Sequence, residues 1–296
     1  MTLKGICRLL RLPLFVTAVA DVLAGYTVAM LPRLGKFDWH VAAMLAGTST
    51  GLYLFGMVTN DLVDVRRDRW LGAPRPLATG ELGIGTAVLL LLATAGLAAG
   101  CAVHLPGTAL LLAIATFVTV GLYNLAAKHG PATIAMTVMG LARFFNFGIG
   151  ASAVVGIPVA AGWGLFAPSG PLWMRLGLAI FFAAAVITGY SIAERRQETV
   201  SSRPWLVAFI ATAVVGFILI AMPTVWPALQ KGPIRFVPPV TRVLAMLVLA
   251  LLWPGGLRPA TGHLRRPDEY APFIQRALYW LILMDAAFVL DGLLIR

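Results

Sequence analysis

Residues 82–103 read LGIGTAVLLLLATAGLAAGCAV and contain no charged side chain. A run of about 20 apolar residues is long enough to cross the hydrocarbon core of a bilayer as a helix. Because no water is present there, the main-chain amide and carbonyl groups must pair within the segment, which favours a helix over an open strand. This stretch therefore predicts a transmembrane helix.

The rest of the chain repeats this pattern. Of its 296 residues, 59% are hydrophobic and 12% are charged, whereas a soluble domain carries roughly a quarter charged residues. The mean hydropathy is +0.87, and the connections between apolar runs are short. We therefore predict an all-α polytopic membrane bundle that forms one domain over residues 1–296. The nine expected spans are Leu12–Leu31, Trp39–Val58, Leu82–Val103, Thr108–Leu125, Ala132–Val155, Trp173–Ile192, Trp205–Met222, Val240–Trp253 and Ala277–Leu294.

Basic residues dominate the charge, with 23 Lys and Arg against 12 Asp and Glu and a formal net charge of +11. If the N-terminus is cytoplasmic, most of them fall in cytoplasmic loops, in keeping with the positive-inside rule. The excess is thus an orientation signal, and no basic surface with interleaved aromatic residues indicates nucleic acid as a partner. We expect an integral protein of the plasma or inner membrane, embedded in lipid. The sequence carries no signal for a protein partner or an oligomeric state.

Three aspartates follow the second apolar run. The stretch from residue 60 to residue 68 reads NDLVDVRRD. Asp61, Asp64 and Asp68 are spaced three and four residues apart, which places them on one face of a helix. Asn60, four residues before Asp64, shares that face. All the strongly charged loops, this one included, fall on the predicted cytoplasmic side.

Three like charges on one face need compensation, and two sources are open. One is a divalent cation, because Mg²⁺ takes oxygen ligands and is usually held by one or two carboxylates together with substrate phosphates. Alternatively, the segment is a solvated, charge-balanced helix end without a ligand. In that case the compensating charges would belong to the adjacent residues Arg66, Arg67 and Arg69.

A basic turn follows the aspartates, reading RPLATG over residues 75–80. Its proline and its position predict a rigid turn that folds back over the helix end. The combination NDxxDxxxD and RPLxTG resembles the first signature of the UbiA superfamily of intramembrane prenyltransferases. The resemblance implies Mg²⁺, an isoprenyl diphosphate and a hydrophobic or aromatic acceptor that attacks the allylic carbon. It assigns Mg²⁺ binding to Asn60, Asp61, Asp64 and Asp68, a catalytic role to Asp61 and Asp64, and phosphate binding to Arg75.

The second signature of that family, a Tyr followed by two Asp, is altered here. Residues 190–198 read YSIAERRQE, so Glu194 and Glu198 stand four residues apart on one helical face. Both are candidate Mg²⁺ ligands. Alternatively, Arg195 or Arg196 pairs with the diphosphate through its planar guanidinium fork. Tyr190 is a further candidate contact to phosphate.

The altered motif resembles one branch of the superfamily, called EboC. So do the segments YNLAAK at residues 123–128 and RFFNFGIGA at residues 143–151. That branch is linked to export or maturation of a lipid-like or indolic metabolite precursor. The leading interpretation is a Mg²⁺-dependent prenyltransferase. The alternative is a non-catalytic UbiA-like protein that binds or translocates a prenylated or lipidic metabolite precursor.

Ionisable side chains inside the apolar runs are a separate signal, because an arginine at mid-span costs at least about 2.5 kcal/mol on insertion scales. For Arg143 the resemblance implies a catalytic role or a contact to the diphosphate. The alternative is a structural ion pair with Asp21 or Asp285. For Lys128 the alternative is a lysine at the membrane interface whose side chain extends until its ammonium group reaches water. The other diphosphate contacts that the resemblance implies are Asp21, Tyr123, Asn124, Lys128 and Asn146.

Overall fold

The computed structural model describes residues 3–30, 37–155 and 172–196, together with Ile274, Leu278, Tyr279 and Asp285. Within these ranges the secondary structure is helical and contains no strand. The main helices are α1 (Leu3–Leu10), α2 (Phe15–Met30), α3 (Trp39–Trp70), α4 (Ile84–Ala102), α5 (Gly107–Leu125), α6 (Ala132–Val155) and α7 (Leu172–Arg196). Single 3₁₀ turns at Leu12–Leu14 and Ala127–His129 precede α2 and follow α5.

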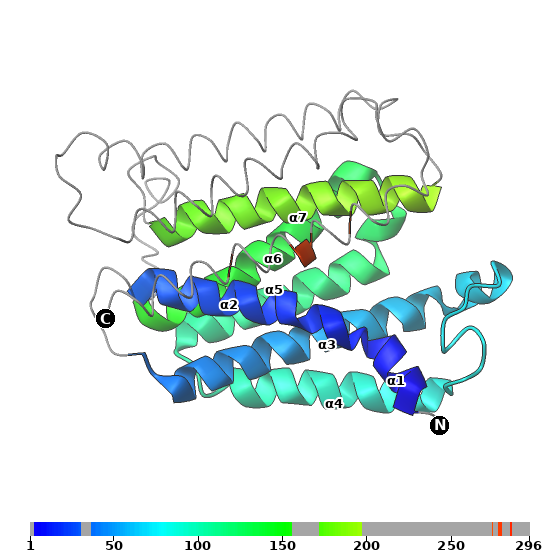
Figure 1. Cartoon of the computed structure of the whole chain (residues 1–296), viewed down its shortest axis with the longest axis horizontal. Helices are drawn as coiled ribbons and strands as arrows, with labels where there is room; N and C mark the ends of the chain where they lie inside the picture. Colours follow the sequence, from blue (N-terminus) through cyan, green and yellow to red (C-terminus); the bar gives the residue numbers. More distant parts are fainter. Residues whose placement is uncertain are drawn as a thin grey trace.

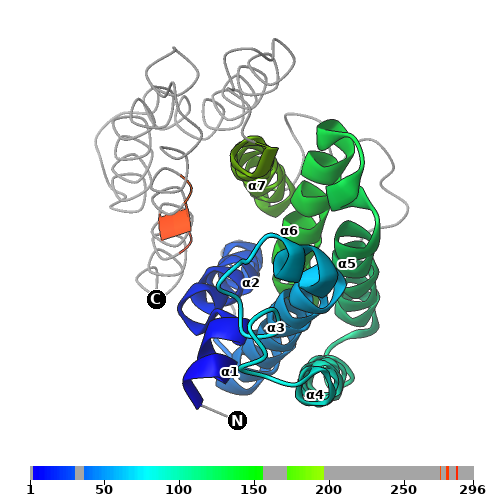
Figure 2. The same ribbon diagram turned by 90° about the vertical axis from the view of Figure 1, so that its right-hand side faces the viewer.

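The long helices lie side by side along one direction (Figure 1). Helix α6 packs against α2, α5 and α7, while α3 packs against α2, α4 and α5. Figure 2 looks along the helices and shows α4 at one edge of the described bundle and α7 at the other. Each of α3, α4, α5, α6 and α7 contains a stretch long and apolar enough to cross a membrane. The predicted all-α membrane bundle is therefore confirmed.

Six of the nine predicted spans coincide with helices, α2 to α7. The predicted spans Trp205–Met222 and Val240–Trp253 lie outside the described residues. The span Ala277–Leu294 is described only at Leu278, Tyr279 and Asp285, all helical. The second predicted span is part of a longer helix, because α3 continues beyond Val58 to Trp70 and carries the three aspartates on a helix, as their spacing predicts.

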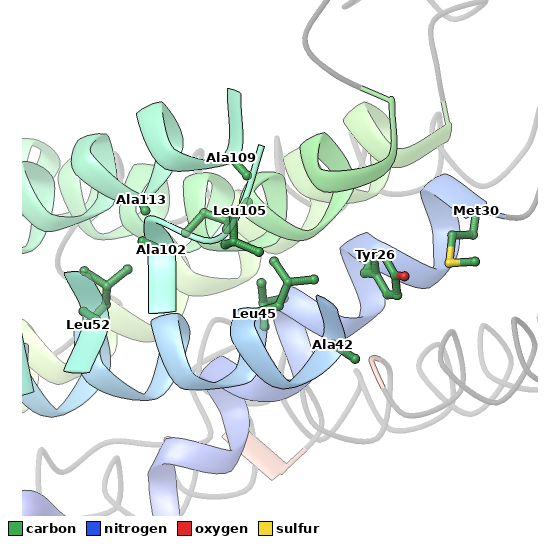
Figure 3. Packing of buried hydrophobic residues seen from close by; sticks show 12 residues of the cluster. Tyr26, Met30, Ala42, Leu45, Leu52, Ala102, Leu105, Ala109 and Ala113 are labelled. Atoms are coloured by element: carbon green, nitrogen blue, oxygen red, sulfur yellow. The ribbon is translucent and has the colours of Figure 1, made fainter. Parts of the chain in front are cut away.

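A cluster of small and medium-sized side chains joins α2, α3, α4, α5 and α6 (Figure 3). Leu45 of α3 is fully buried there, with Leu105 from the turn between α4 and α5 and Ala109 from the first turn of α5. Helix α2 and helix α6 approach so closely that a Cβ atom on Gly150 would lie 1.8 Å from the carbonyl oxygen of Val22. Contacts through small residues are typical of helix association in membranes, where close van der Waals packing drives assembly.

Replacement of Gly150 with alanine should destabilise the bundle by about 1–3 kcal/mol, the usual range for an overpacked core. The backbone of α2 has to move, because the obstructing atom is a main-chain carbonyl oxygen of Val22. Unfolding of the detergent-solubilised protein on titration with a denaturing detergent measures the effect. The matched control is Gly96→Ala in α4, where a Cβ would meet nothing within 4 Å. Equal stability of the two variants would contradict the close contact between α2 and α6.

Candidate functional site

The C-terminal end of α3 carries the carboxylate face, which we define as Asp61, Asp64 and Asp68. The three residues are only 3%, 4% and 7% exposed, so this is not a solvated helix end. The helix ends at Trp70, and its C-cap residue Leu71 is followed by Gly72 with a φ of 64°. Three adjacent side chains predicted to compensate these charges are exposed: Arg66, Arg67 and Arg69. Of these, Arg67 interacts electrostatically with Asp68.

Arg75 folds back onto the carboxylate face, as the sequence predicts. Its Nη1 lies 2.6 Å from Oδ1 of Asp61, and its Nε lies 3.1 Å from Oδ2 of Asp68. The turn that carries Arg75 is closed by the amide of Thr79, which donates to the Arg75 carbonyl at 2.9 Å. Leu77 anchors the turn, since it is 1% exposed and packs in a cluster formed by α1, α3 and α4. One guanidinium therefore bridges the two outer aspartates.

Lys128 reaches the middle aspartate from the turn after α5. Its Nζ lies 2.9 Å from Oδ2 of Asp64 and 3.1 Å from Oδ1 of Asn60. The Lys128 side chain is fully buried, whereas a lysine that reaches the interface would keep its ammonium group in water. His129, the next residue, places its Nε2 3.9 Å from Oδ1 of Asp64. The chain thus brings Asn60, Asp64 and Lys128 together across 64 residues of sequence.

Arg11 completes the set of cations, with its Nη2 3.3 Å from Oδ1 of Asp61. This residue was not among the predicted site residues. It separates α1 from α2 and has φ 47° and ψ 46°, in the left-handed region. Such a conformation costs about 1–3 kcal/mol for a residue other than glycine and often marks a functional site. Pro13 was the available signal, because proline is favoured in the first turn of a helix and so indicates that a new helical element begins just after Arg11.

The carboxylate face is therefore neutralised by cations that are distant in sequence. Among the described residues, Oδ1 of Asp64 is the fully buried atom of this face that has no hydrogen-bond partner. An orphaned carboxylate oxygen beside Asn60 suits Mg²⁺, which prefers oxygen ligands and is completed by water and phosphate. Among the described residues, no three His, Cys, Asp or Glu side chains are close enough to hold a metal unaided. The donor set thus fits a Mg²⁺ ion that shares its coordination with a phosphate ligand.

A cavity of about 260 Å³ opens beside Asp61. Its lining offers three guanidinium groups against one carboxylate, so its net charge is positive. Arg8 is fixed there by Glu81, at 3.1 Å, and by the carbonyl oxygen of Pro74. Guanidinium groups match phosphate oxygens well because they can donate two parallel hydrogen bonds. The lining residues are Arg8, Arg11, Asp61, Pro74, Arg75 and Pro76.

Arg143 does not join this group. Its Nη1 lies 2.6 Å from Oδ2 of Asp21, and its Nη2 lies 2.8 Å from Oγ1 of Thr17. The ion pair with Asp21, one of the two alternatives that the sequence left open, is therefore present. Tyr53 interacts electrostatically with both Arg11 and Arg143. It precedes Asp61 by eight residues, about 12 Å along a helix at 1.5 Å per residue.

Asn146 lies in the same inner region. Its Nδ2 donates to the carbonyl oxygen of Ala18 at 2.8 Å, and its Oδ1 lies 2.8 Å from the hydroxyl of Ser49. These contacts join α2, α3 and α6. Asn124 also connects two helices. Its Nδ2 donates to the carbonyl oxygen of Gly56 at 3.2 Å, which links α5 to α3. Both amides thus bind the main chain of neighbouring helices.

The remaining predicted residues lie near the end of α7 or beside it. Tyr123 packs with Ile192 and other apolar side chains between α5, α6 and α7. Tyr190 is fully buried, and Glu194 is half-buried. Arg195 and Arg196 close α7, but their side chains lie outside the described part of the structure, as does all of Glu198. The altered second motif is therefore only partly placed.

No protein-family model and no curated protein matches the sequence. Solved structures do match the fold. An apo UbiA homolog from Aeropyrum pernix K1 is 21% identical, with 93% of this chain and 97% of that chain covered and a TM-score of 0.65. A digeranylgeranylglyceryl phosphate synthase is 16% identical, with 98% of both chains covered and a TM-score of 0.65. A UbiA homolog from Archaeoglobus fulgidus bound to DMAPP and Mg²⁺ is 16% identical, with 98% of both chains covered and a TM-score of 0.64. This membrane bundle therefore has the UbiA fold.

Proposed function

We propose that this chain is an intramembrane prenyltransferase, which uses Mg²⁺ to transfer an isoprenyl group from its diphosphate to a hydrophobic or aromatic acceptor. The observation that carries the proposal is the buried carboxylate face, with its orphaned Asp64 oxygen and the basic cavity beside it. Structures of the same fold bound to DMAPP or GPP and Mg²⁺ support the choice of substrate class. The charge bias of the loops supports a cytoplasmic position for this site.

The proposed Mg²⁺ ligands are the carboxylate face and Asn60, with Glu194 and Glu198 as a second set. Bound there, the metal would neutralise charge that develops on the departing diphosphate. Arg75 and Arg11 line the basic cavity, and we assign them to the diphosphate. Both already contact Asp61, so a small rotation of each guanidinium would let it face a phosphate while remaining beside the carboxylate.

Lys128 has a different proposed role because it is fully buried between Asn60 and Asp64. It fixes the orientation of the Asp64 carboxylate through Oδ2 and leaves Oδ1 open. A contact of Lys128 with the diphosphate remains part of the proposal. Phosphate contacts also stay predictions for Tyr123, Tyr190, Arg195 and Arg196. By contrast, the contacts of Arg143, Asp21, Asn146 and Asn124 described above favour roles inside the bundle.

A second candidate function is a non-catalytic protein of the EboC type that binds or translocates a prenylated or lipidic metabolite precursor. One observation favours it. Arg11, Arg75 and Lys128 already neutralise the carboxylate face without a metal. The basic residues of the altered second motif support it as well. The two functions differ in one respect, which is that only the enzyme breaks the bond between the allylic carbon and the diphosphate.

The altered motif makes a graded prediction. Glu198→Ala should lower kcat less than a change at Asp64 does, because Arg195 or Arg196 is expected to supply positive charge where a second metal would otherwise sit. Steady-state release of diphosphate by each variant measures the difference. If both variants lose activity equally, the site is an ordinary two-metal site and the arginines do not substitute for a cation.

Binding is the direct test of the proposed substrate class. The purified protein is titrated with farnesyl diphosphate at increasing Mg²⁺ concentrations, and the heat of binding is recorded. We expect saturable binding that requires Mg²⁺, with geranylgeranyl diphosphate as a second ligand and farnesol as the control that lacks the diphosphate. Equal binding of farnesol, or no binding of either diphosphate, would contradict the proposal.

A further inference from the structure

A second ionisable cluster lies inside the bundle. Tyr53 of α3, which interacts with Arg143 of this cluster, precedes Asp61 by eight residues, so the cluster lies about two helical turns deeper than the carboxylate face. It consists of Asp21 on α2, Arg143 on α6 and Asp285, a helical residue near the C-terminus. Both aspartates have an exposed fraction of 0%. Ionisable residues at this depth are rare in membrane proteins, face the bundle interior and commonly belong to ion or proton pathways. The carboxylate face and its ligands do not account for this cluster.

The cluster has more hydrogen-bond acceptors than donors. Arg143 donates one hydrogen bond from Nη1 to Oδ2 of Asp21 and another from Nη2 to Oγ1 of Thr17. Three carboxylate oxygens remain buried without a hydrogen-bond partner, namely Oδ1 of Asp21 and both oxygens of Asp285. Buried polar atoms are nearly always satisfied in folded proteins, so unsatisfied ones indicate a missing ion, water or proton.

The charges do not balance either. Counted over the residues that the structure describes, two carboxylates and one guanidinium leave one negative charge in excess. The groups that face Arg143 are Asp21 on α2, Tyr53 on α3 and Asp285, and none of these adds positive charge. An uncompensated charge in a low-dielectric interior is strongly unfavourable. A species that carries one positive charge must therefore be bound at Asp21 and Asp285.

The position of Asp285 identifies this species. Its carboxyl group interacts with the carboxyl group of Asp21 and with the guanidinium of Arg143. Two ionised carboxylates have no hydrogen to share and would repel each other. One proton on either of them removes the repulsion, creates a hydrogen bond and restores neutrality at once, as in other close carboxyl pairs.

We propose that Asp21 and Asp285 form a proton-binding site, in which one proton is shared by the two carboxyl groups and Arg143 balances the remaining charge. The proton resides mainly on Asp285, because Asp21 already accepts a hydrogen bond from Arg143. In this state the hydroxyl of Asp285 donates to the open Oδ1 of Asp21. Loss of the proton would place two like charges together, so the site also works as a pH-sensitive tether between Asp285 and α2.

Infrared spectroscopy of the full chain in lipid nanodiscs tests the proposal at neutral pH. The wild type should show the carbonyl-stretching band of a protonated carboxylic acid, and Asp285→Asn should remove it. Asp21→Asn should also remove it, because Asp285 would then ionise as the partner of Arg143. The control Asp38→Asn, in the cap at the opposite end of α3, should leave the band unchanged. A wild-type spectrum without the band, or a band that persists in Asp285→Asn, would overturn the proposal.

Thermal stability supplies a second readout that does not depend on the spectrum. The folded protein holds the proton and the unfolded chain releases it, so the folded state binds more protons and the melting temperature should fall as the pH rises above neutral. In Asp285→Asn, which resembles the protonated form in shape, this fall should be smaller. If sodium chloride at constant ionic strength raises the melting temperature of the wild type but not of Asp285→Asn, the bound species is a sodium ion and the proton site is refuted.

Discussion

Asp64→Asn should reduce kcat by roughly a hundredfold or more, the loss that follows removal of a single group that stabilises charge in a transition state. The substitution keeps the shape of the side chain but removes its charge. It also puts a nitrogen or a neutral oxygen at the position of Oδ1, the buried atom that has no hydrogen-bond partner. We expect the Mg²⁺ concentration for half-maximal binding of farnesyl diphosphate to rise as well, because the anionic ligand is lost. Diphosphate release and calorimetry measure the two effects.

The matched control is Asp38→Asn on the same helix. Asp38 caps the N-terminal end of α3, where its Oδ1 accepts hydrogen bonds from the amides of His40 and Val41. Asparagine caps helices about as well as aspartate does, so both stability and activity should stay close to those of the wild type. If Asp64→Asn were as active as Asp38→Asn, the carboxylate face would have no part in turnover.

Lys128→Met should have the largest effect on stability, a loss of about 3–5 kcal/mol, as when one partner of a buried ion pair is removed. Methionine fills similar space, but it leaves Asp64 with a buried negative charge that only the distant His129 can offset. Unfolding in a denaturing detergent measures the loss. Addition of Mg²⁺ should restore part of the stability of this variant and have less effect on the wild type, since the cation replaces the missing ammonium group.

A double-mutant cycle separates the ion pair from simple packing. In Lys128→Met combined with Asp64→Asn the buried charge is gone, so the double variant should be more stable than Lys128→Met alone. Residues in direct contact typically show such coupling, whereas distant ones give additive effects. Additive losses, or a Lys128→Met variant that is as stable as the wild type, would contradict the buried pair.

Local features of the site could be predicted from sequence because they depend on neighbours along the chain. The spacing of Asp61, Asp64 and Asp68 fixes a common helical face, and a single proline-stiffened turn brings Arg75 back to it. The full length of α3 was missed, since hydropathy falls after Val58 although the helix continues to Trp70. Gly72 and Pro74 were the better signals for the helix end.

Other features depend on the tertiary fold, and the sequence could offer only alternatives. The adjacent arginines and a metal ion were the expected sources of compensating charge. The structure adds Arg11 and Lys128, which are 50 and 64 residues away from their aspartates. No spacing rule links such positions. The left-handed backbone at Arg11 is likewise a consequence of tertiary contacts, and the ion pair between Arg143 and Asp21 was predicted only as one of two possibilities.

One measurement tests prenyl transfer at the carboxylate face most directly. The purified protein is incubated with radiolabelled farnesyl diphosphate, Mg²⁺ and a lipid extract that supplies hydrophobic acceptors, and both free diphosphate and labelled lipid are quantified. We expect equal amounts of the two products, formed only with Mg²⁺ and abolished in Asp64→Asn. Binding that requires Mg²⁺ but yields neither free diphosphate nor labelled lipid would contradict the enzyme and support the non-catalytic alternative.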